Sequence, residues 1–337
     1  VTDPNNLTLV GEFQDARLAN VADIKIIGQT LYAASRNGDD IATINIGCDP
    51  AFVPFNSGAD IGFDPEGANC LANDGGPFTL AGTYSTLASA HGVWSDNNYV
   101  YVAAAASGLH VFDYNGASFT LIDTYDTGGN AEAVWGDGTY IYVADNWLIS
   151  VYTFDGSTLT QIDEISTGGY IAENIWGDGS YIYVVGQNTG VHAYSFDGTS
   201  IVPVASYVTS DARAAWGDGT YIYVADRGSG IRAFRFNGVA FTEIASYNTI
   251  AISYDVWSDG TYIYVADEWG GLTALTFDGY GFIEIASTSQ FSLRIWGDGV
   301  YIYTIDSNTN DVLAYSFDGS SFTLINSNTS TTDVRDI

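Results

Sequence analysis

Basic residues are scarce in this chain of 337 residues. It has 9 Lys and Arg residues against 40 Asp and Glu residues, so its formal net charge is -31 at pH 7. Nucleic acids and anionic membrane surfaces are recognised by clustered positive charges. We therefore expect no nucleic acid partner and no membrane insertion.

Methionine and long apolar runs are also missing. No stretch reaches the roughly 20 apolar residues that a membrane-spanning helix needs. The hydrophobic fraction of 46% nevertheless separates the chain from a disordered acidic tail, so we expect a compact fold. A chain that starts at Val1 and lacks methionine is typical of a processed, secreted protein. We expect an extracellular or cell-surface location.

Cysteine is limited to Cys48 and Cys70, which lie in one stretch rich in Gly, Pro and Asn. A disulfide between them would close a loop that has little core of its own, and secretion favours a disulfide over two free thiols. Asn6 and Asn328 each begin a glycosylation triplet, although such triplets also arise by chance.

The chain repeats itself. The segment WGDGTYIYVAD occupies residues 135–145 and again 216–226. Tryptophans recur about every 40 residues, a period typical of propeller blades, at Trp94, Trp135, Trp176, Trp216, Trp257 and Trp296. One earlier copy, at 22–35, has Lys25 in the tryptophan position, and an insertion at about 47–77 follows it. Seven repeat units result.

Each unit has the pattern of four short strands. In residues 139–145, tyrosines alternate with Ile141 and Val143, so both faces of this strand are apolar and buried. The Asp-Gly pairs, such as Asp137-Gly138, predict two-residue hairpin turns with both central residues at positive φ. This assigns the repeated aspartates to turns rather than to metal binding, and the tryptophans to packing between blades. We predict one all-β domain over 1–337, a seven-bladed β-propeller of four-stranded antiparallel blades.

The segment LIDTYDTGGNAEAVWGDGTYIYVADNWLISVYTFDG, together with YIYVADRGSGIRAF at 221–234, resembles the repeats of LVIVD-repeat propellers. These are secreted or surface proteins of bacteria and archaea. The resemblance implies the propeller fold and an extracellular compartment, and it implies no particular reaction.

A ring of varied polar residues is predicted at the central channel. Three positions before the tryptophans, consecutive units carry His91, Glu132, Glu173, Arg213 and Tyr254. Such a ring would converge on a small polar ligand or a cation. The alternative is that Arg213 forms a structural ion pair with a neighbouring glutamate and the other side chains are solvated.

Three further features are candidates for binding, and none indicates catalysis. Trp147 and Trp269 interrupt the repeat in loops, where they would bind a glycan or another protein, or cap their own blades. The insertion offers calcium the oxygens of Asp60, Asp64 and Glu66, in a spacing that is not diagnostic. We expect no other cofactor. No nucleophile, metal or phosphate motif is present, so we expect no enzyme.

The two ends of the chain duplicate each other. Residues 7–13 and 322–327 both have the pattern of an outermost strand, within the terminal segments 7–24 and 322–337. A closed ring has room for one of them. Either the chain is cut from a longer array, or the surplus strand is an extra edge on its own blade, or it pairs with a neighbouring subunit. The apolar residues of these candidate assembly strands are Leu7, Leu9, Phe13, Phe322 and Leu324.

The leading hypothesis is a non-enzymatic extracellular structural or interaction scaffold. It would assemble head to tail through the surplus strand, with other copies of itself or another surface protein as partner. One alternative is a propeller that binds, or hydrolyses, glycans or small ligands at its variable face. Another is a single propeller of a larger cell-surface protein.

Overall fold

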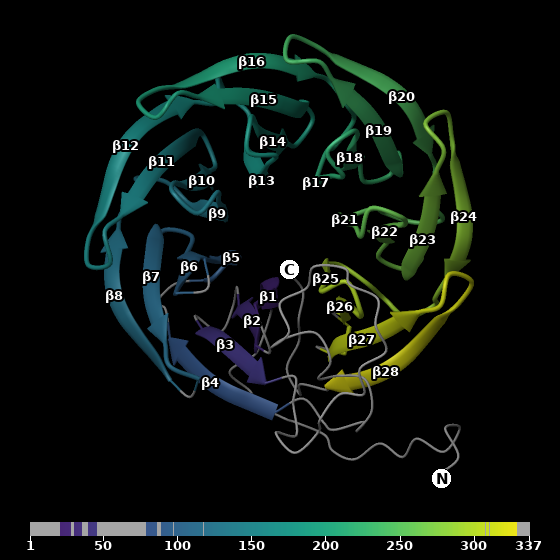
Figure 1. Cartoon of the computed structure of the whole chain (residues 1–337), viewed down its shortest axis with the longest axis horizontal. Helices are drawn as coiled ribbons and strands as arrows, with labels where there is room; N and C mark the ends of the chain where they lie inside the picture. Colours follow the sequence, from purple (N-terminus) through teal and green to yellow (C-terminus); the bar gives the residue numbers. More distant parts are fainter. Residues whose placement is uncertain are drawn as a thin grey trace, which may run out of the picture.

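The structure is a computed structural model, which describes residues 21–27, 30–35, 40–45, 79–85, 89–96, 98–116, 118–306, 308–309 and 311–328. The described residues form four-stranded antiparallel sheets arranged around a central axis (Figure 1). The prediction of an all-β propeller with four-stranded antiparallel blades is confirmed. The described part contains no helix that is long and apolar enough to cross a membrane.

Each sheet is made by consecutive strands of one continuous stretch of chain. The first three sheets consist of β1 (Val21–Ile27), β2 (Thr30–Ser35), β3 (Asp40–Asn45), β4 (Thr79–Ser85); β5 (Gly92–Ser95), β6 (Tyr99–Ala103), β7 (Leu109–Tyr114), β8 (Phe119–Tyr125); and β9 (Ala131–Gly136), β10 (Ile141–Asp145), β11 (Leu148–Phe154), β12 (Leu159–Ser166). The next two consist of β13 (Ala172–Gly177), β14 (Ile182–Gly186), β15 (Gly190–Phe196), β16 (Ile201–Tyr207); and β17 (Ala214–Gly217), β18 (Ile222–Ala225), β19 (Ile231–Phe236), β20 (Phe241–Tyr247). The last two consist of β21 (Asp255–Ser258), β22 (Ile263–Ala266), β23 (Leu272–Phe277), β24 (Phe282–Ser287); and β25 (Ile295–Gly297), β26 (Ile302–Asp306), β27 (Asp311–Phe317), β28 (Phe322–Asn328).

Six of these sheets, from β5 to β28, are described with their side chains, and the sheet β1–β4 is described by its backbone pairing. Strand β1 contacts both β5 and β25, so this sheet lies between the second and the last along the ring. In every sheet the first strand lies beside the channel and the fourth lies at the rim (Figure 1).

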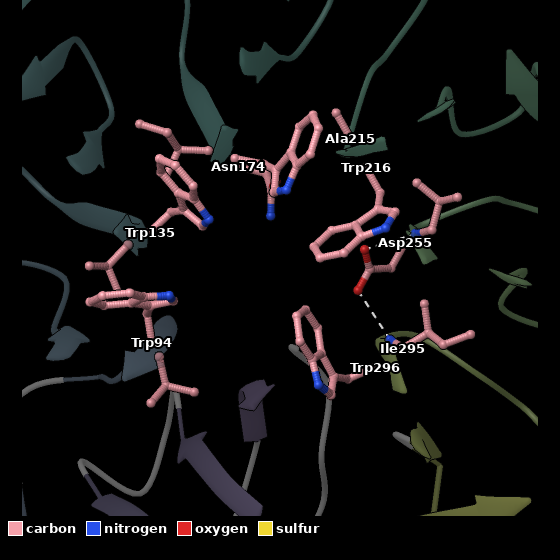
Figure 2. Close-up of a pocket in the computed structure, with 13 residues that line it drawn as sticks. Trp94, Trp135, Asn174, Ala215, Trp216, Asp255, Ile295 and Trp296 are labelled. Carbon is pink, nitrogen blue, oxygen red and sulfur yellow. Dashed lines mark hydrogen bonds between the residues drawn. The ribbon is translucent and has the colours of Figure 1, made fainter. Parts of the chain in front are cut away.

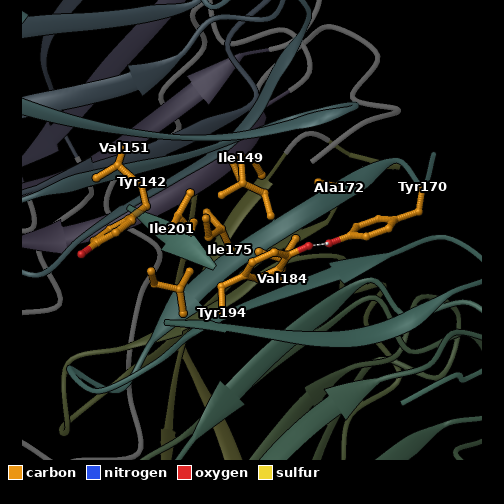
Figure 3. Close-up of a cluster of buried hydrophobic side chains, with 12 residues drawn as sticks. Tyr142, Ile149, Val151, Tyr170, Ala172, Ile175, Val184, Tyr194 and Ile201 are labelled. Carbon is orange, nitrogen blue, oxygen red and sulfur yellow. Dashed lines mark hydrogen bonds between the residues drawn. The ribbon is translucent and has the colours of Figure 1, made fainter. Parts of the chain in front are cut away.

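The core lies between neighbouring blades. Strand β10 is buried along its whole length, as its two apolar faces predict, whereas the outermost strand β12 has one buried residue, Leu159, and is otherwise half-buried or exposed. Between β9–β12 and β13–β16, Tyr142 and Val151 pack with Ile175 and Val184 (Figure 3). The hydroxyl groups of Tyr170 and Tyr194 lie 2.8 Å apart in the same cluster, which satisfies both buried polar groups.

The repeated Trp-Gly pair joins one blade to the next. The indole of Trp135 lies over Gly177 of the following blade, and a Cβ atom at Gly177 would stand 2.5 Å from that ring. Only glycine leaves this space free. The same contact recurs between Trp94 and Gly136, Trp176 and Gly217, and Trp257 and Gly297. The prediction that the tryptophans pack between blades is confirmed for these four.

Trp216 departs from this pattern because the next blade carries Ser258 at the position of Gly136, Gly177, Gly217 and Gly297. The serine side chain takes the space that glycine leaves free, and its hydroxyl donates to the carbonyl of Tyr262 at 2.8 Å. The indole of Trp216 instead meets that of Trp296 edge to face, with ring centroids 5.2 Å apart.

The turn prediction was wrong by one residue. Asp137 is not at positive φ and only Gly138 is, at 89°. The backbone N–H of Asp137 donates to the carbonyl of Tyr140, so the two central residues are Gly138 and Thr139, with glycine first as in type II′ turns. Asp137 Oδ1 accepts the N–H groups of Thr139 and Tyr140, and Oδ2 accepts the hydroxyl of Tyr142. The aspartate is therefore the anchor of the turn rather than its centre.

Candidate functional site

The channel opens on two different faces. On one, the turn face, lie the Asp-Gly turns. On the other, the connection face, lie the blade-to-blade connections and the loops between second and third strands.

A buried aspartate fixes each of several connections on the connection face. Asp226, just after β18, accepts the N–H of Asp211 at 2.7 Å and the guanidinium of Arg232 at 2.7 Å. Burial alone would raise the pKa of Asp226, but these hydrogen bonds outweigh burial and lower it. Asp267 accepts the N–H of Ala251 at 2.9 Å in the next blade. Asp226 and Asp267, which end two copies of the repeated Tyr-Val-Ala-Asp segment, are thus structural.

The residue after this aspartate position has an unusual backbone. Ala105, Asn146, Arg227 and Glu268 all have positive φ, between 38° and 45°, and each forms an isolated bridge with the blade that follows. Residues other than glycine adopt this conformation rarely, and it persists where the surroundings enforce it. Here the bridge to the next blade holds the backbone, so the side chain at this position is free to vary from blade to blade beside the channel.

Four of the five predicted ring residues form pairs at the connection-face mouth. His91 Nδ1 lies 2.6 Å from Glu132 Oε2, and Arg213 Nη1 lies 3.5 Å from Glu173 Oε2. Glu173 also accepts a hydrogen bond from Gln187. The structure therefore brings these residues together as pairs between neighbouring blades. For Arg213 this is the structural ion pair with a neighbouring glutamate that the sequence left open as the alternative to a ligand site.

A second carboxylate joins two arginines at this mouth. Asp211 lies 3.2 Å from the Nε of Arg213 and 2.9 Å from an Nη of Arg227. The guanidinium carbons of both arginines lie within 6 Å of the Tyr254 ring centroid, at 5.7 and 5.9 Å. Its hydrogen bond with Asp211 raises the pKa of Arg227. Burial raises the pKa of Glu268, in the neighbouring loop, and Arg227 opposes that shift. The result is a compact charged cluster of carboxylates, arginines and one tyrosine.

Asp211, Gln187 and Arg227 were missed by the sequence reasoning, because they lie in connections and loops outside the aligned positions. Their signal was visible only as a departure from the repeat: Arg227 occupies the positive-φ position where other blades carry Ala105 or Asn146.

The two loop tryptophans are exposed, Trp147 at 52% and Trp269 at 69%. Trp269 also packs edge to face against Phe291, with ring centroids 5.1 Å apart, so it partly covers its own blade. Both lie in loops on the connection face. They remain candidates for contact with a partner.

The other candidate residues are placed as follows. Phe322 and Leu324 lie in β28, where Phe322 packs against Tyr264 and Phe317. Asn328 is the last residue of that strand. The remaining candidates lie outside the described residues: Asn6, Leu7, Leu9, Phe13, Cys48, Asp60, Asp64, Glu66 and Cys70.

The described residues include no group of three or more His, Cys, Asp or Glu side chains that could hold a metal ion. His192 is stacked on Tyr170 with ring centroids 4.0 Å apart, and burial lowers its pKa to about 4. A neutral, stacked histidine of this kind is a core residue.

The turn-face end of the channel holds a cavity of about 80 Å³. Trp94, Trp135, Trp216 and Trp296 line it together with Asn174 and Asp255 (Figure 2). The Asp255 carboxylate accepts the N–H groups of Ile295 at 3.1 Å and Val256 at 2.9 Å. Burial raises its pKa to about 6, although Arg294 nearby acts in the opposite direction.

These blades and their repeats define a β-propeller that contains LVIVD repeats. The family model described as the LVIVD repeat matches residues 88–127, 128–149 and 252–275. No curated protein matches the sequence.

Solved structures share the fold at low sequence identity. A putative 6-phosphogluconolactonase from Bacteroides fragilis is 14% identical, covers 94% of this chain and 95% of its own, and has a TM-score of 0.68. One from Bacteroides uniformis is also 14% identical, with coverages of 87% and 93% and the same TM-score. The computationally designed Ika8 protein is 7% identical, with coverages of 97% and 92% and a TM-score of 0.65. At these identities the likeness concerns the fold alone.

Proposed function

We propose that this propeller is a non-enzymatic extracellular scaffold that associates head to tail with other copies of itself. The proposal takes the ring as seven blades, with β1–β4 as the blade between β25–β28 and β5–β8. The observation that carries it is that every sheet has its own outermost strand: β4, β8, β12, β16, β20, β24 and β28. Residues 7–13, which have the pattern of an eighth outermost strand, thus duplicate a role that is already filled.

Apolar side chains on both faces of the same blades support association. Val208, Ile250 and Trp269 are 74%, 81% and 69% exposed and lie on the connection face. Val239 and Tyr280 are 75% and 87% exposed in Asp-Gly-type turns of the opposite face. Two different patches on opposite faces fit a heterologous contact, which repeats from copy to copy without closing.

The pairing at the connection-face mouth supports a non-enzymatic role. Arg213 pairs with Glu173 of the neighbouring blade and also with Asp211, so these groups are engaged in structural ion pairs between blades. The proposed extracellular location rests on the sequence, through the single cysteine pair and the resemblance to LVIVD-repeat propellers.

Sedimentation velocity tests the assembly. Ile250→Asp alters the connection face and Tyr280→Asp alters the turn face, and each head-to-tail junction needs both faces, so each variant alone should be a monomer. An equimolar mixture of the two should form dimers, since one intact junction remains possible. The control is Val202→Asp, because Val202 is 50% exposed in the rim strand β16, away from both patches.

Deletion of residues 1–13 tests the strand contribution. The shortened chain should be a monomer with unchanged β-type circular dichroism. Because the net charge of -31 opposes association, the intact protein should associate more at higher salt. An intact protein that stays monomeric at high concentration and high salt would refute the proposal.

A second candidate function is ligand binding at the connection-face mouth, favoured by the two arginines that flank Tyr254. A polar ligand with a carboxylate, such as an acidic sugar, would compete with Asp211 for these guanidinium groups. Titration of glucuronate, followed by calorimetry, should show binding that Arg227→Met weakens, with the melting temperature nearly unchanged because Arg227 is 40% exposed. Equal heats for the protein and for that variant would exclude this site.

A further inference from the structure

The tryptophans at the turn-face end of the channel present their edges to it. Trp135 is stacked on Tyr142 with an interplanar angle of 27°, and Trp176 on Tyr183 with an angle of 19°. Their ring faces are therefore covered inside the blades. Figure 2 shows the indole nitrogens of Trp94 and Trp135 pointing into the channel. An aromatic edge is electropositive, and the indole N–H is a donor only.

These donors have no acceptor in the described protein. No described side chain or backbone carbonyl accepts a hydrogen bond from the indole N–H groups of Trp94, Trp135 or Trp176. Trp94 and Trp176 are only 8% and 9% exposed. The indole nitrogens are not among the buried polar atoms that lack a partner, so they open into the channel, where an acceptor held in the cavity can reach them.

The sheet β1–β4 has a basic residue at the position equivalent to these tryptophans. In β1, Lys25 pairs with Tyr32 in the register in which Trp135 pairs with Tyr142 in the third blade. Lys25 thus occupies the tryptophan position of its sheet, and it is the sole lysine of the chain. The single lysine of this chain, whose net charge is -31, therefore occupies the position at which Trp94, Trp135 and Trp176 carry indole N–H groups without an acceptor.

We propose that this end of the channel binds a small monovalent anion, such as a halide or the carboxylate group of a small acid. Its donors are the indole N–H groups of Trp94 and Trp135, with the Asn174 amide beside them (Figure 2). The site lies on the side of the channel opposite Asp255, whose carboxylate would repel an anion. A cavity of about 80 Å³ admits an ion of this size. The site is separate from the charged cluster and does not depend on the proposed function.

Chloride titration tests the site. Chloride replaces a bulky sulfonate buffer anion at constant sodium concentration, and intrinsic tryptophan fluorescence and the melting temperature are followed. Binding should give a saturable fluorescence change and a melting temperature that rises with chloride. Trp94→Phe and Trp135→Phe keep an aromatic ring but remove the N–H, and each should weaken binding by about tenfold or more. Acetate in place of chloride tests the carboxylate form.

Two controls separate the site from general salt effects. Trp147→Phe, in an exposed loop, should bind chloride as the unaltered protein does, whereas Lys25→Gln should bind it more weakly. If the indole variants fold poorly, the chloride affinity of Lys25→Gln tests the proposal in their place. A linear fluorescence response, or equal affinity in the variants of Trp94, Lys25 and Trp147, would overturn the proposal.

Discussion

Replacing Gly177 by alanine should destabilise the propeller by about 1–3 kcal/mol, the usual cost of forcing a methyl group into a packed interior. The added Cβ atom would stand 2.5 Å from two ring carbons of Trp135 and 3.1 Å from the carbonyl oxygen of Tyr181. Ordinary contacts at a Cβ atom begin near 3.4 Å. Gly177 has no positive φ, so backbone strain does not contribute and the loss measures the contact between blades.

Urea denaturation of the variant and of Gly281→Ala provides the measurement. A Cβ atom at Gly281 meets nothing within 4 Å, and this residue also lacks a positive φ. Gly281→Ala should therefore be neutral or stabilising by about 0.4–1 kcal/mol, because alanine restricts the unfolded chain. The tryptophan emission of Gly177→Ala should also shift to longer wavelength as Trp135 moves toward the channel. Equal unfolding free energies for the two variants would refute the account of inter-blade packing.

Three further predictions concern charges and thiols. Arg232→Met should lower the free energy of unfolding by roughly 3 kcal/mol, the lower end of the range for breaking a buried ion pair. The reason is that it leaves the carboxylate of Asp226 buried without its cation. The pKa of Asp255 is raised to about 6, so the folded state holds this proton more tightly than the unfolded state does. The resulting contribution to the free energy of unfolding is lost as the pH rises from about 4 through 6. Asp255→Asn should remove that decline from the pH profile of the melting temperature. We propose a disulfide between Cys48 and Cys70, so thiol titration of the denatured, unreduced protein should find no free thiol.

Each of these has its own control and contrary result. Arg235, on the same strand, is a suitable partner variant, because Arg235→Met removes an exposed arginine and should change stability little. If both arginine variants lose the same free energy, the buried pair with Asp226 is not the cause. An unaltered slope between pH 4 and 6 in Asp255→Asn would assign the titration to another group. Two titrated thiols would exclude the disulfide.

The repeat predicted the blades because one local pattern, written several times, has one structural solution. The alternation in 139–145 predicted the buried second strand, and the recurring tryptophans predicted packing between blades. The turn was misplaced by one residue because an Asp-Gly pair can fill either the two central positions of a hairpin turn or the first two of its four positions. The choice depended on whether Asp137 accepts two backbone N–H groups, which a residue pattern does not reveal.

The candidate site was predicted only in part, because repeat alignment finds residues at equivalent positions and misses those between them. It identified Glu173 and Arg213 as neighbours, and they form a pair. It missed Asp211, which lies in a blade-to-blade connection. The path of this connection depends on the hydrogen bond that the N–H of Asp211 donates to the buried Asp226. The displacement of Trp216 by Ser258 was equally hidden, because a glycine-to-serine difference has no meaning until the facing indole is known.

The continuous origin of each sheet has a consequence for how such a ring can change. Because none of the described sheets contains a strand from a distant part of the chain, a blade is also a unit of sequence, with its beginning and end at neighbouring connections. A gene segment that encodes one such unit can be duplicated, removed or exchanged without separating hydrogen-bonded partners in any other sheet. The near-identical copies at 135–145 and 216–226 are what recent duplication by this route would leave behind.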